Sequence, residues 1–204
     1  MTGDGDGFRL DFADEAIVEA QLGRVPRGAV AVAWRCPCGK PGVVRTAPRL
    51  PDGTPFPTTY YLTCPNAVKA CSTLEGSGWM AEMTARLGTE PGLAARYAEA
   101  HQSYLADRED LGEQLGIDVP EISGVSAGGM PERVKCVHAL VAHALAKGAG
   151  VNPVGDEALS AMGEWRKPCL PGFEASSRPV ILPQAGSPTF SRGLDPGSYH
   201  KEER

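Results

Sequence analysis

Residues 132–147, which read ERVKCVHALVAHALAK, place the strongest constraint on how the rest of the chain packs. Val134, Val137 and Val141 recur at helical spacing, and Leu145 extends the same stripe. The positions facing away from this stripe are largely alanine, a residue that a protein interior accepts. The pattern therefore predicts a helix that other elements surround on almost all sides.

Three β-rich runs precede this helix, at residues 29–34, 43–46 and 60–63. The first two are joined by the sequence CPCG at residues 36–39, which is typical of a tight turn. Four prolines within residues 48–57 remove backbone donors and predict a stiff loop between the second and third runs. We expect the three runs to form a small antiparallel sheet.

Helices are predicted on both sides of this sheet in the sequence. Residues 11–22 have a short helical pattern that Gly23 can end, and Pro65 suits the first turn of another helix. Thr89 can cap a long helix, and Asp156 can cap a last short one. We therefore expect an α+β protein with a small antiparallel sheet in the N-terminal third, packed on a mainly helical second half.

The length and composition predict one globular domain. A chain of 204 residues has enough apolar side chains for a single substantial core, and its 42% hydrophobic and 22% charged residues are near the globular average. We expect the domain to span residues 11–170. Residues 1–10 are predicted to be a flexible N-terminus, and residues 171–204 a disordered tail rich in Pro, Gly and Ser.

The charge distribution excludes several classes of function. The net charge is −5, and most of the acidic excess lies in the opening residues, so no basic face is available to bind nucleic acid. No apolar run is long enough to cross a bilayer, which predicts that the protein has no membrane span. The acidic N-terminus also lacks the basic region of a secretory signal, and we expect a cytoplasmic protein.

Six cysteines are the main candidates for a functional site. In the reducing cytoplasm they are not expected to form disulfides. Cys36 lies in a turn, and Cys64 and Cys136 lie near helix N-termini, where thiolates are favoured. These three cysteines, together with Cys38 beside Cys36 and Cys169 after Pro168, are candidate ligands for zinc or an iron–sulfur cluster. The alternative is that the cysteines only pack the core as small apolar residues.

Helical geometry constrains the two histidines of the predicted central helix. On a regular helix Cys136 and His138 point about 160° apart, so both cannot bind one ion. Cys136 and His143 lie about 10 Å apart along the axis, which is too far for one ion. Cys136 is thus the ligand expected from this helix. His138 and His143 are expected to hydrogen-bond a metal ligand, to face a substrate, or to pack in the core.

A second kind of site is predicted just before the same helix. Gly128 and Gly129 lie in a turn, and Arg133 and Lys135 fall in what should be the first helical turn. Free backbone N–H groups, the helix dipole and two cations together favour a small anionic ligand there. The alternative is an ordinary loop with surface cations.

Four stretches resemble one known family: RCPCGKPGVV at 35–44, PFPTTYYLTCP at 55–65, GMPERVKCVHALVAH at 129–143 and NPVGD at 152–156. Read together, they resemble the bacterial family called domain of unknown function 501, over about residues 14–169. The resemblance is to actinobacterial members above all, whose genes often lie beside those for a septum-formation initiator and an exopolyphosphatase. By association alone, these neighbours imply a role in cell division, with a protein partner there, or in polyphosphate metabolism.

The resemblance also implies which residues matter. Cys38 matches the family less regularly than the others, so the resemblance implies metal ligands drawn from distant segments: Cys36, Cys64 and Cys136, with Cys169 or Cys38 as the fourth, for zinc or an iron–sulfur cluster. The positions that match the family's recurring motifs are Cys36, Cys64, Cys136, His138 and His143.

Three functions are compatible with these residues. The leading hypothesis is a cytoplasmic metal-binding protein with an adjacent anion site; three protein ligands would leave a position open for metal-assisted chemistry. The second is a non-catalytic interaction protein linked to cell division, with cysteines that only pack. The third is a metal-free thiol enzyme that uses Cys64 or Cys136 with a histidine. Whether the protein is an enzyme stays open at this point.

Overall fold

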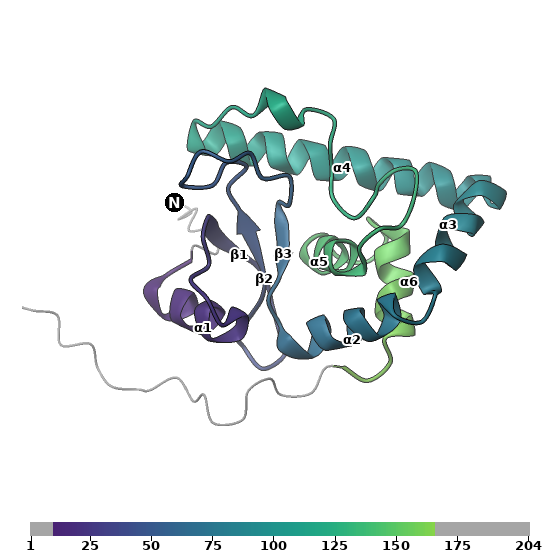
Figure 1. The fold of residues 1–204 in the computed structure, drawn as a ribbon, viewed down its shortest axis with the longest axis horizontal. Helices are drawn as coiled ribbons and strands as arrows, with labels where there is room; N and C mark the ends of the chain where they lie inside the picture. The colour runs from purple at the N-terminus through teal and green to yellow at the C-terminus, as the bar shows by residue number, and fades with distance from the viewer. Residues whose placement is uncertain (1–9, 166–204) are drawn as a thin grey trace, which may run out of the picture. The chain divides into compact units, whose positions relative to one another are not determined.

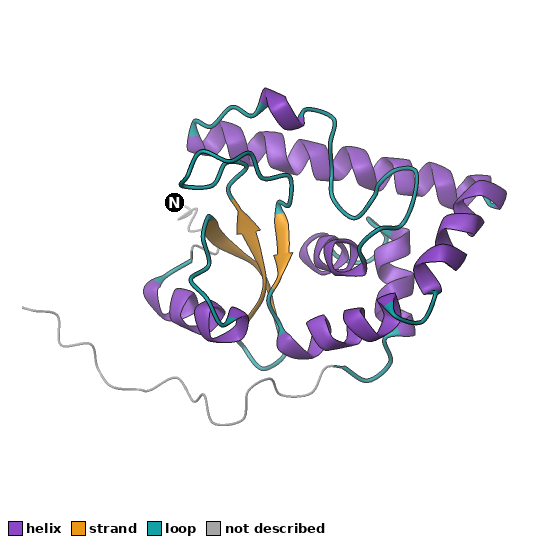
Figure 2. Cartoon of the chain, in the orientation of Figure 1, coloured by secondary structure: helices purple, strands orange, loops and turns teal. Residues whose placement is uncertain are grey.

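The structure is a computed structural model that describes residues 10–165, all of which belong to one compact unit of the chain. A three-stranded sheet lies on one side of this unit and helices form the rest (Figure 2). The elements are, in chain order, α1 Phe12–Leu22, β1 Ala29–Arg35, β2 Pro41–Thr46, β3 Tyr60–Leu62, α2 Pro65–Glu75, α3 Trp79–Thr89, α4 Pro91–Leu115, the 3₁₀ turn η1 Pro120–Ile122, α5 Val137–Lys147 and α6 Pro153–Ala161.

The sheet is antiparallel with strand order β1-β2-β3, as the three β-rich runs predicted. Val44 of the central strand pairs with Val32 on one side and Tyr61 on the other. Gly42, also in β2, must lack a side chain because a Cβ there would lie 2.4 Å from the ring of Trp34. The α+β fold class is therefore confirmed.

Helix α5 lies at the centre of the described unit, between β3, α2 and α6 (Figure 1). Eight of its eleven residues are buried, which confirms the prediction of a helix enclosed on nearly all sides. Its approach to α6 is close enough that a Cβ on Gly155 would lie 2.4 Å from the carbonyl oxygen of Leu140. Glycine at this position therefore permits the contact between the two helices.

The predicted start of this central helix is wrong. Helix α5 begins at Val137, and the residues before it form a loop folded back on Gly128. The carbonyl oxygen of Gly128 accepts the N–H groups of Lys135 (2.7 Å) and Cys136 (3.3 Å). These bonds hold the backbone before Val137 in a loop. Arg133 and Lys135 therefore lie in that loop and not in the first turn of α5.

Two predicted helix caps are also wrong. Thr89 is the last residue of α3, a helix that the sequence patterns did not predict, and α4 follows after Glu90. The side chain of Asn152 caps α6 by accepting the N–H of Gly155 (2.9 Å). Asp156 lies inside that helix and instead accepts the N–H of Gly150 (2.7 Å).

An aromatic layer joins the sheet to the helices. Tyr97 and Tyr104 of α4 are fully buried, and Tyr104 accepts the backbone N–H of Thr59 (2.7 Å), next to β3. The imidazole of His143 stacks on Tyr60 with centroids 5.6 Å apart and meets Tyr104 edge to face at 5.1 Å. Among the helices of residues 10–165, none has the length and apolar character needed to span a membrane.

Candidate functional site

Glu75, Cys136 and His138 form a cluster where the end of α2 meets the start of α5. The Nδ1 atom of His138 lies 3.0 Å from Oε1 of Glu75 and 4.0 Å from Sγ of Cys136. One ligand atom from each of the three residues lies within 4.8 Å of the others. Among the Cys, His and acidic side chains of residues 10–165, these three are the ones that converge closely enough to hold one ion.

The late start of α5 brings Cys136 and His138 together. Cys136 precedes the helix with extended backbone angles, φ −150° and ψ 111°. The separation of about 160° expected for a regular helix therefore does not apply, and both side chains turn toward the same point. The expected separation of Cys136 and His138 was wrong, because it assumed a regular helix from residue 132 onward.

The carboxylate of Glu75 occupies the N-terminus of α5. Its Oε1 accepts the backbone N–H of Val137 (2.7 Å), one of the donors that a helix start leaves without an internal partner. Burial raises the pKa of Glu75, but the hydrogen bonds from His138 and the Val137 N–H outweigh it and hold that pKa below its usual value. The chain's own carboxylate thus takes the place of an anion at this helix end.

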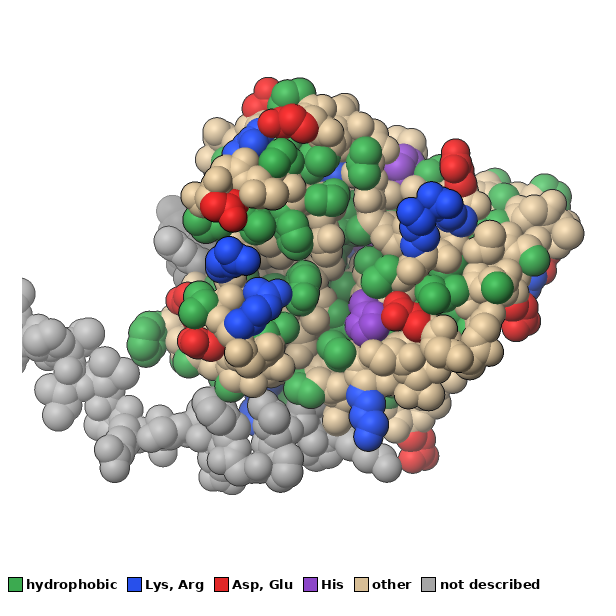
Figure 3. Space-filling view, in the orientation of Figure 1, with side chains coloured by type: hydrophobic (Ala, Val, Ile, Leu, Met, Phe, Trp, Pro, Cys, Tyr) green, Lys and Arg blue, Asp and Glu red, His purple; other side chains and the backbone are tan. Residues whose placement is uncertain are grey.

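His138 is bonded on both sides of its ring. The hydrogen bond with Cys136 and the carboxylate of Glu75 raise the pKa of His138 to about 9, against the opposing effect of burial. Its Nε2 atom lies 3.3 Å from Oγ of Ser72. About a quarter of the His138 and Glu75 side chains is exposed, so the cluster is open to solvent. Figure 3 shows a histidine against an acidic side chain among apolar groups on the face in view.

Three further cysteines are buried: Cys36 after β1, Cys64 before α2 and Cys71 within α2. Cys64 donates its N–H to the carbonyl oxygen of Gly42 in β2 (3.2 Å). Cys36 follows β1, the strand that pairs with the other edge of β2. Cys71 is fully buried, and its Sγ lies 3.8 Å from Sδ of Met162. Burial raises the pKa of Cys71 to about 12, with smaller contributions from neighbouring Glu75, Cys136 and Cys64. Cys71 is therefore a protonated packing group.

Of the four predicted metal ligands, the fold brings Cys36 and Cys64 to the same end of the sheet and places Cys136 at the start of α5. Cys136 and Cys64 are both close enough to Cys71 to affect its pKa. Cys169 lies outside the described residues. The predicted four-cysteine set thus stays a prediction.

The residues predicted to bind an anion lie together in the loop before α5. Their backbone groups are bonded within the loop: the N–H of Lys135 to the carbonyl of Gly128, and that of Arg133 to the carbonyl of Gly129 (3.1 Å). The side chains of Arg133 and Lys135 are exposed. The anion site therefore stays a prediction that rests on these two cations.

His143 lies away from the cluster, inside the aromatic layer. Its Nδ1 lies 3.2 Å from the amide nitrogen of Asn152, and its Nε2 is buried without a partner among the described residues. Burial lowers the pKa of His143 to about 4, so the ring is neutral at pH 7. Its surroundings are those of a core residue.

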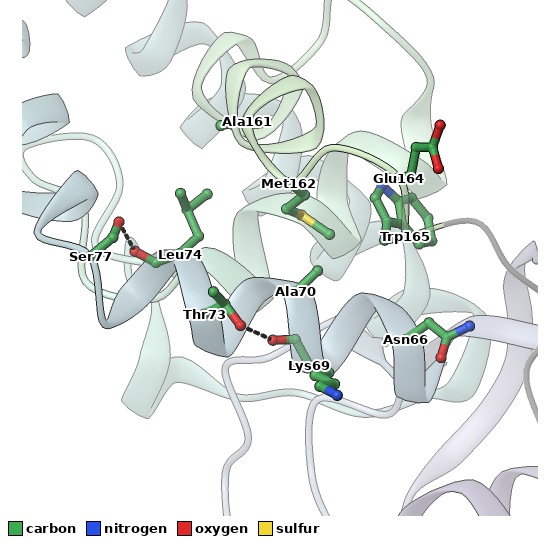
Figure 4. A pocket seen from close by; sticks show the side chains of 10 residues that line it. All are labelled: Asn66, Lys69, Ala70, Thr73, Leu74, Ser77, Ala161, Met162, Glu164 and Trp165. Carbon is green, nitrogen blue, oxygen red and sulfur yellow. Dashed lines mark hydrogen bonds between the residues drawn. The ribbon is translucent and has the colours of Figure 1, made fainter.

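A separate cavity of about 420 Å³ lies on the other face of α2, against the end of α6 (Figure 4). It is lined by apolar and polar side chains, and Met162 connects it to the sulfur of Cys71. Ser72 and Glu75 do not line it because they project from the opposite side of the helix. The cavity is therefore distinct from the cluster.

Glu75 and Ser72 were missed by the sequence patterns. Glu75 is the last residue of α2, where the helix dipole disfavours a carboxylate. This unfavourable placement is a signal in the sequence, because it indicates a compensating partner elsewhere. Nothing comparable marks Ser72.

The described residues thus define an α+β protein with a carboxylate, thiol and imidazole cluster at the start of a central helix. Residues 32–160 match the family described as "Protein of unknown function (DUF501)". The match covers more than half of the chain, so the protein belongs to this family, which confirms the resemblance seen in its motifs. No curated protein and no solved structure matches the chain.

Proposed function

We propose that the protein binds a divalent metal ion, zinc being the best fit, through Cys136, His138 and Glu75. The observation that carries the proposal is the convergence of Sγ, Nδ1 and an Oε atom within 4.8 Å. Thiolate, imidazole and carboxylate are the three side-chain ligands of zinc in proteins. An ion at their meeting point would replace the proton that His138 Nδ1 shares with Glu75.

The shared nitrogen favours a metal over a thiol catalyst. In a nucleophile–histidine–carboxylate arrangement, the nucleophile and the carboxylate bind opposite nitrogens of the ring. Here Cys136 and Glu75 both approach Nδ1. Three groups directed at one point suit an ion, whereas they leave no nitrogen of His138 to pass a proton between thiol and carboxylate.

Three protein ligands would leave a position for water or for a bound molecule. The exposed cations Arg133 and Lys135 lie in the loop just before Cys136 and would favour an anionic molecule at that position. We propose a cytoplasmic location for this chemistry, since a thiolate ligand is preserved under reducing conditions.

The test is metal analysis of the full-length protein purified anaerobically, followed by titration of the apoprotein with Co²⁺. The wild type should take up one ion per chain, with the visible bands of a thiolate-bound Co²⁺. Cys136→Ser and Glu75→Gln should weaken binding at least tenfold. Glu82→Gln, an exposed carboxylate on α3, is the matched control and should bind as the wild type does.

The alternatives give different results in the same experiment. A brown protein that loses its colour in Cys36→Ser and Cys64→Ser, while Glu75→Gln keeps it, would favour the cysteine-only iron–sulfur centre. A metal-free wild type whose Cys136 is alkylated by iodoacetamide at neutral pH would favour the thiol enzyme. A metal-free protein without a reactive thiol would favour the interaction protein linked to cell division.

A further inference from the structure

Ser72 lies on α2 one turn before Glu75 and faces the ring of His138. Its Oγ lies 3.0 Å from the carbonyl oxygen of Val68 and 3.3 Å from Nε2 of His138. The hydroxyl therefore contacts two groups at once. One of them, the carbonyl, can only accept a hydrogen bond.

The direction of these two bonds follows from proton counting. A serine hydroxyl has one hydrogen, and the contact with the Val68 carbonyl requires that Ser72 donate it there. The Ser72 oxygen can then only accept from His138, so Nε2 must hold a proton. The other ring nitrogen, Nδ1, is left facing Glu75 and Cys136.

We propose that Ser72 is a positioning residue, which keeps Nε2 of His138 protonated and so makes Nδ1 the metal-binding nitrogen. The inference rests on the proposed metal site and names the group that orients its histidine. Metal-binding histidines are commonly held in one tautomer by a hydrogen bond at the other nitrogen, and losing that partner costs about 10- to 100-fold in affinity.

A different function could be drawn from the same contacts. Ser72 at Nε2 and Glu75 at Nδ1 have the connectivity of a serine–histidine–carboxylate triad. In such a triad the serine donates to the histidine, which takes the proton as a base. Here the Ser72 hydroxyl is bonded back to its own helix, and Nε2 is the donor. The geometry therefore favours positioning over nucleophilic attack.

The experiment compares Ser72→Ala and Ser72→Thr in the full-length protein. We expect Ser72→Ala to weaken Co²⁺ binding about tenfold. Ser72→Thr should restore it, because threonine can bond the same carbonyl in a helix. Thr73→Ala is the matched control, since the Thr73 hydroxyl donates to the carbonyl oxygen of Lys69 (3.0 Å) and does not contact His138. It should bind as the wild type does.

Nitrogen-15 NMR of zinc-loaded protein supplies a second readout. The wild type should show His138 bound through Nδ1 with a proton on Nε2, and Ser72→Ala should show a mixture of the two nitrogens. Equal affinity and the same bound nitrogen in wild type and Ser72→Ala would overturn the inference, as would labelling of Ser72 by a fluorophosphonate. If the wild type holds no metal, the spectra are compared above pH 9, where the His138 ring is neutral. A proton that sits on Nε2 in the wild type and moves to Nδ1 in Ser72→Ala would then remove the metal site and keep the positioning contact.

Discussion

The buried ring of His143 should make the stability of the protein depend on pH in a defined window. Its pKa is lowered from 6.5 to about 4 by burial. Between these values the unfolded chain binds a proton that the folded chain does not, so acid favours unfolding. The contribution of His143 is fully present above pH 6.5 and is lost as the pH falls toward 4.

The magnitude follows from the size of the shift. A difference between 6.5 and about 4 corresponds to about 3 kcal/mol of unfolding free energy at pH 4. His101, whose pKa is also lowered by burial, contributes with the same sign. His138 has a raised pKa of about 9, so its contribution changes above this window and not within it.

The assay is urea unfolding of the wild type and His143→Gln at several pH values from 7.5 to 4. The difference between the two proteins removes the contributions of His101 and the carboxylates. We expect the wild type to lose about 3 kcal/mol relative to the variant over this range. NMR titration of His143 in the folded wild type tests the same claim without a variant. The reasoning would be refuted by a difference in unfolding free energy between the two proteins that does not change with pH, or by an NMR titration midpoint of His143 near pH 6.5.

Three further predictions concern the packing of the fold. Gly42→Ala should destabilise the protein by about 2 kcal/mol or more in urea unfolding, because its Cβ would strike Trp34; Gly92→Ala, with open space around it, should change stability little. Arg108→Met should cost about 2 kcal/mol and speed hydrogen exchange near η1, since the buried guanidinium donates to the carbonyls of Val125 and Ile122; unchanged exchange there would contradict this role. Asn152→Ala should lower the thermal midpoint through loss of a helix cap worth about 1 kcal/mol, and more than Asp156→Ala does.

Local signals in the sequence were sufficient for most of the fold. The three strands alternate with turn residues, and Pro65 begins α2 where its missing N–H has no cost. The alanine-rich positions of α5 indicated burial on all sides, because only a surrounded helix has no need of a polar face. These features depend on the residues within one element.

The remaining features depend on contacts between distant segments. Helix α5 begins at Val137 because the carbonyl of Gly128 holds two preceding amides, a geometry that no helical pattern encodes. Helix α3 was missed because Gly76 and Gly78, just before it, are typical of a loop. Cys136 and His138 were candidates from the sequence, but Glu75 joins them only because α2 packs against α5.

The cluster also joins parts of the chain that are far apart in sequence, since Glu75 and Val137 are 62 residues apart. An ion bound there would act as a cross-link closing a loop that contains α3, α4 and η1. By the chain-entropy relation that describes disulfides, closing a loop of this length removes conformational entropy from the unfolded chain worth about 4 kcal/mol. A chelator would then loosen the long helix α4 as well as the residues that touch the metal.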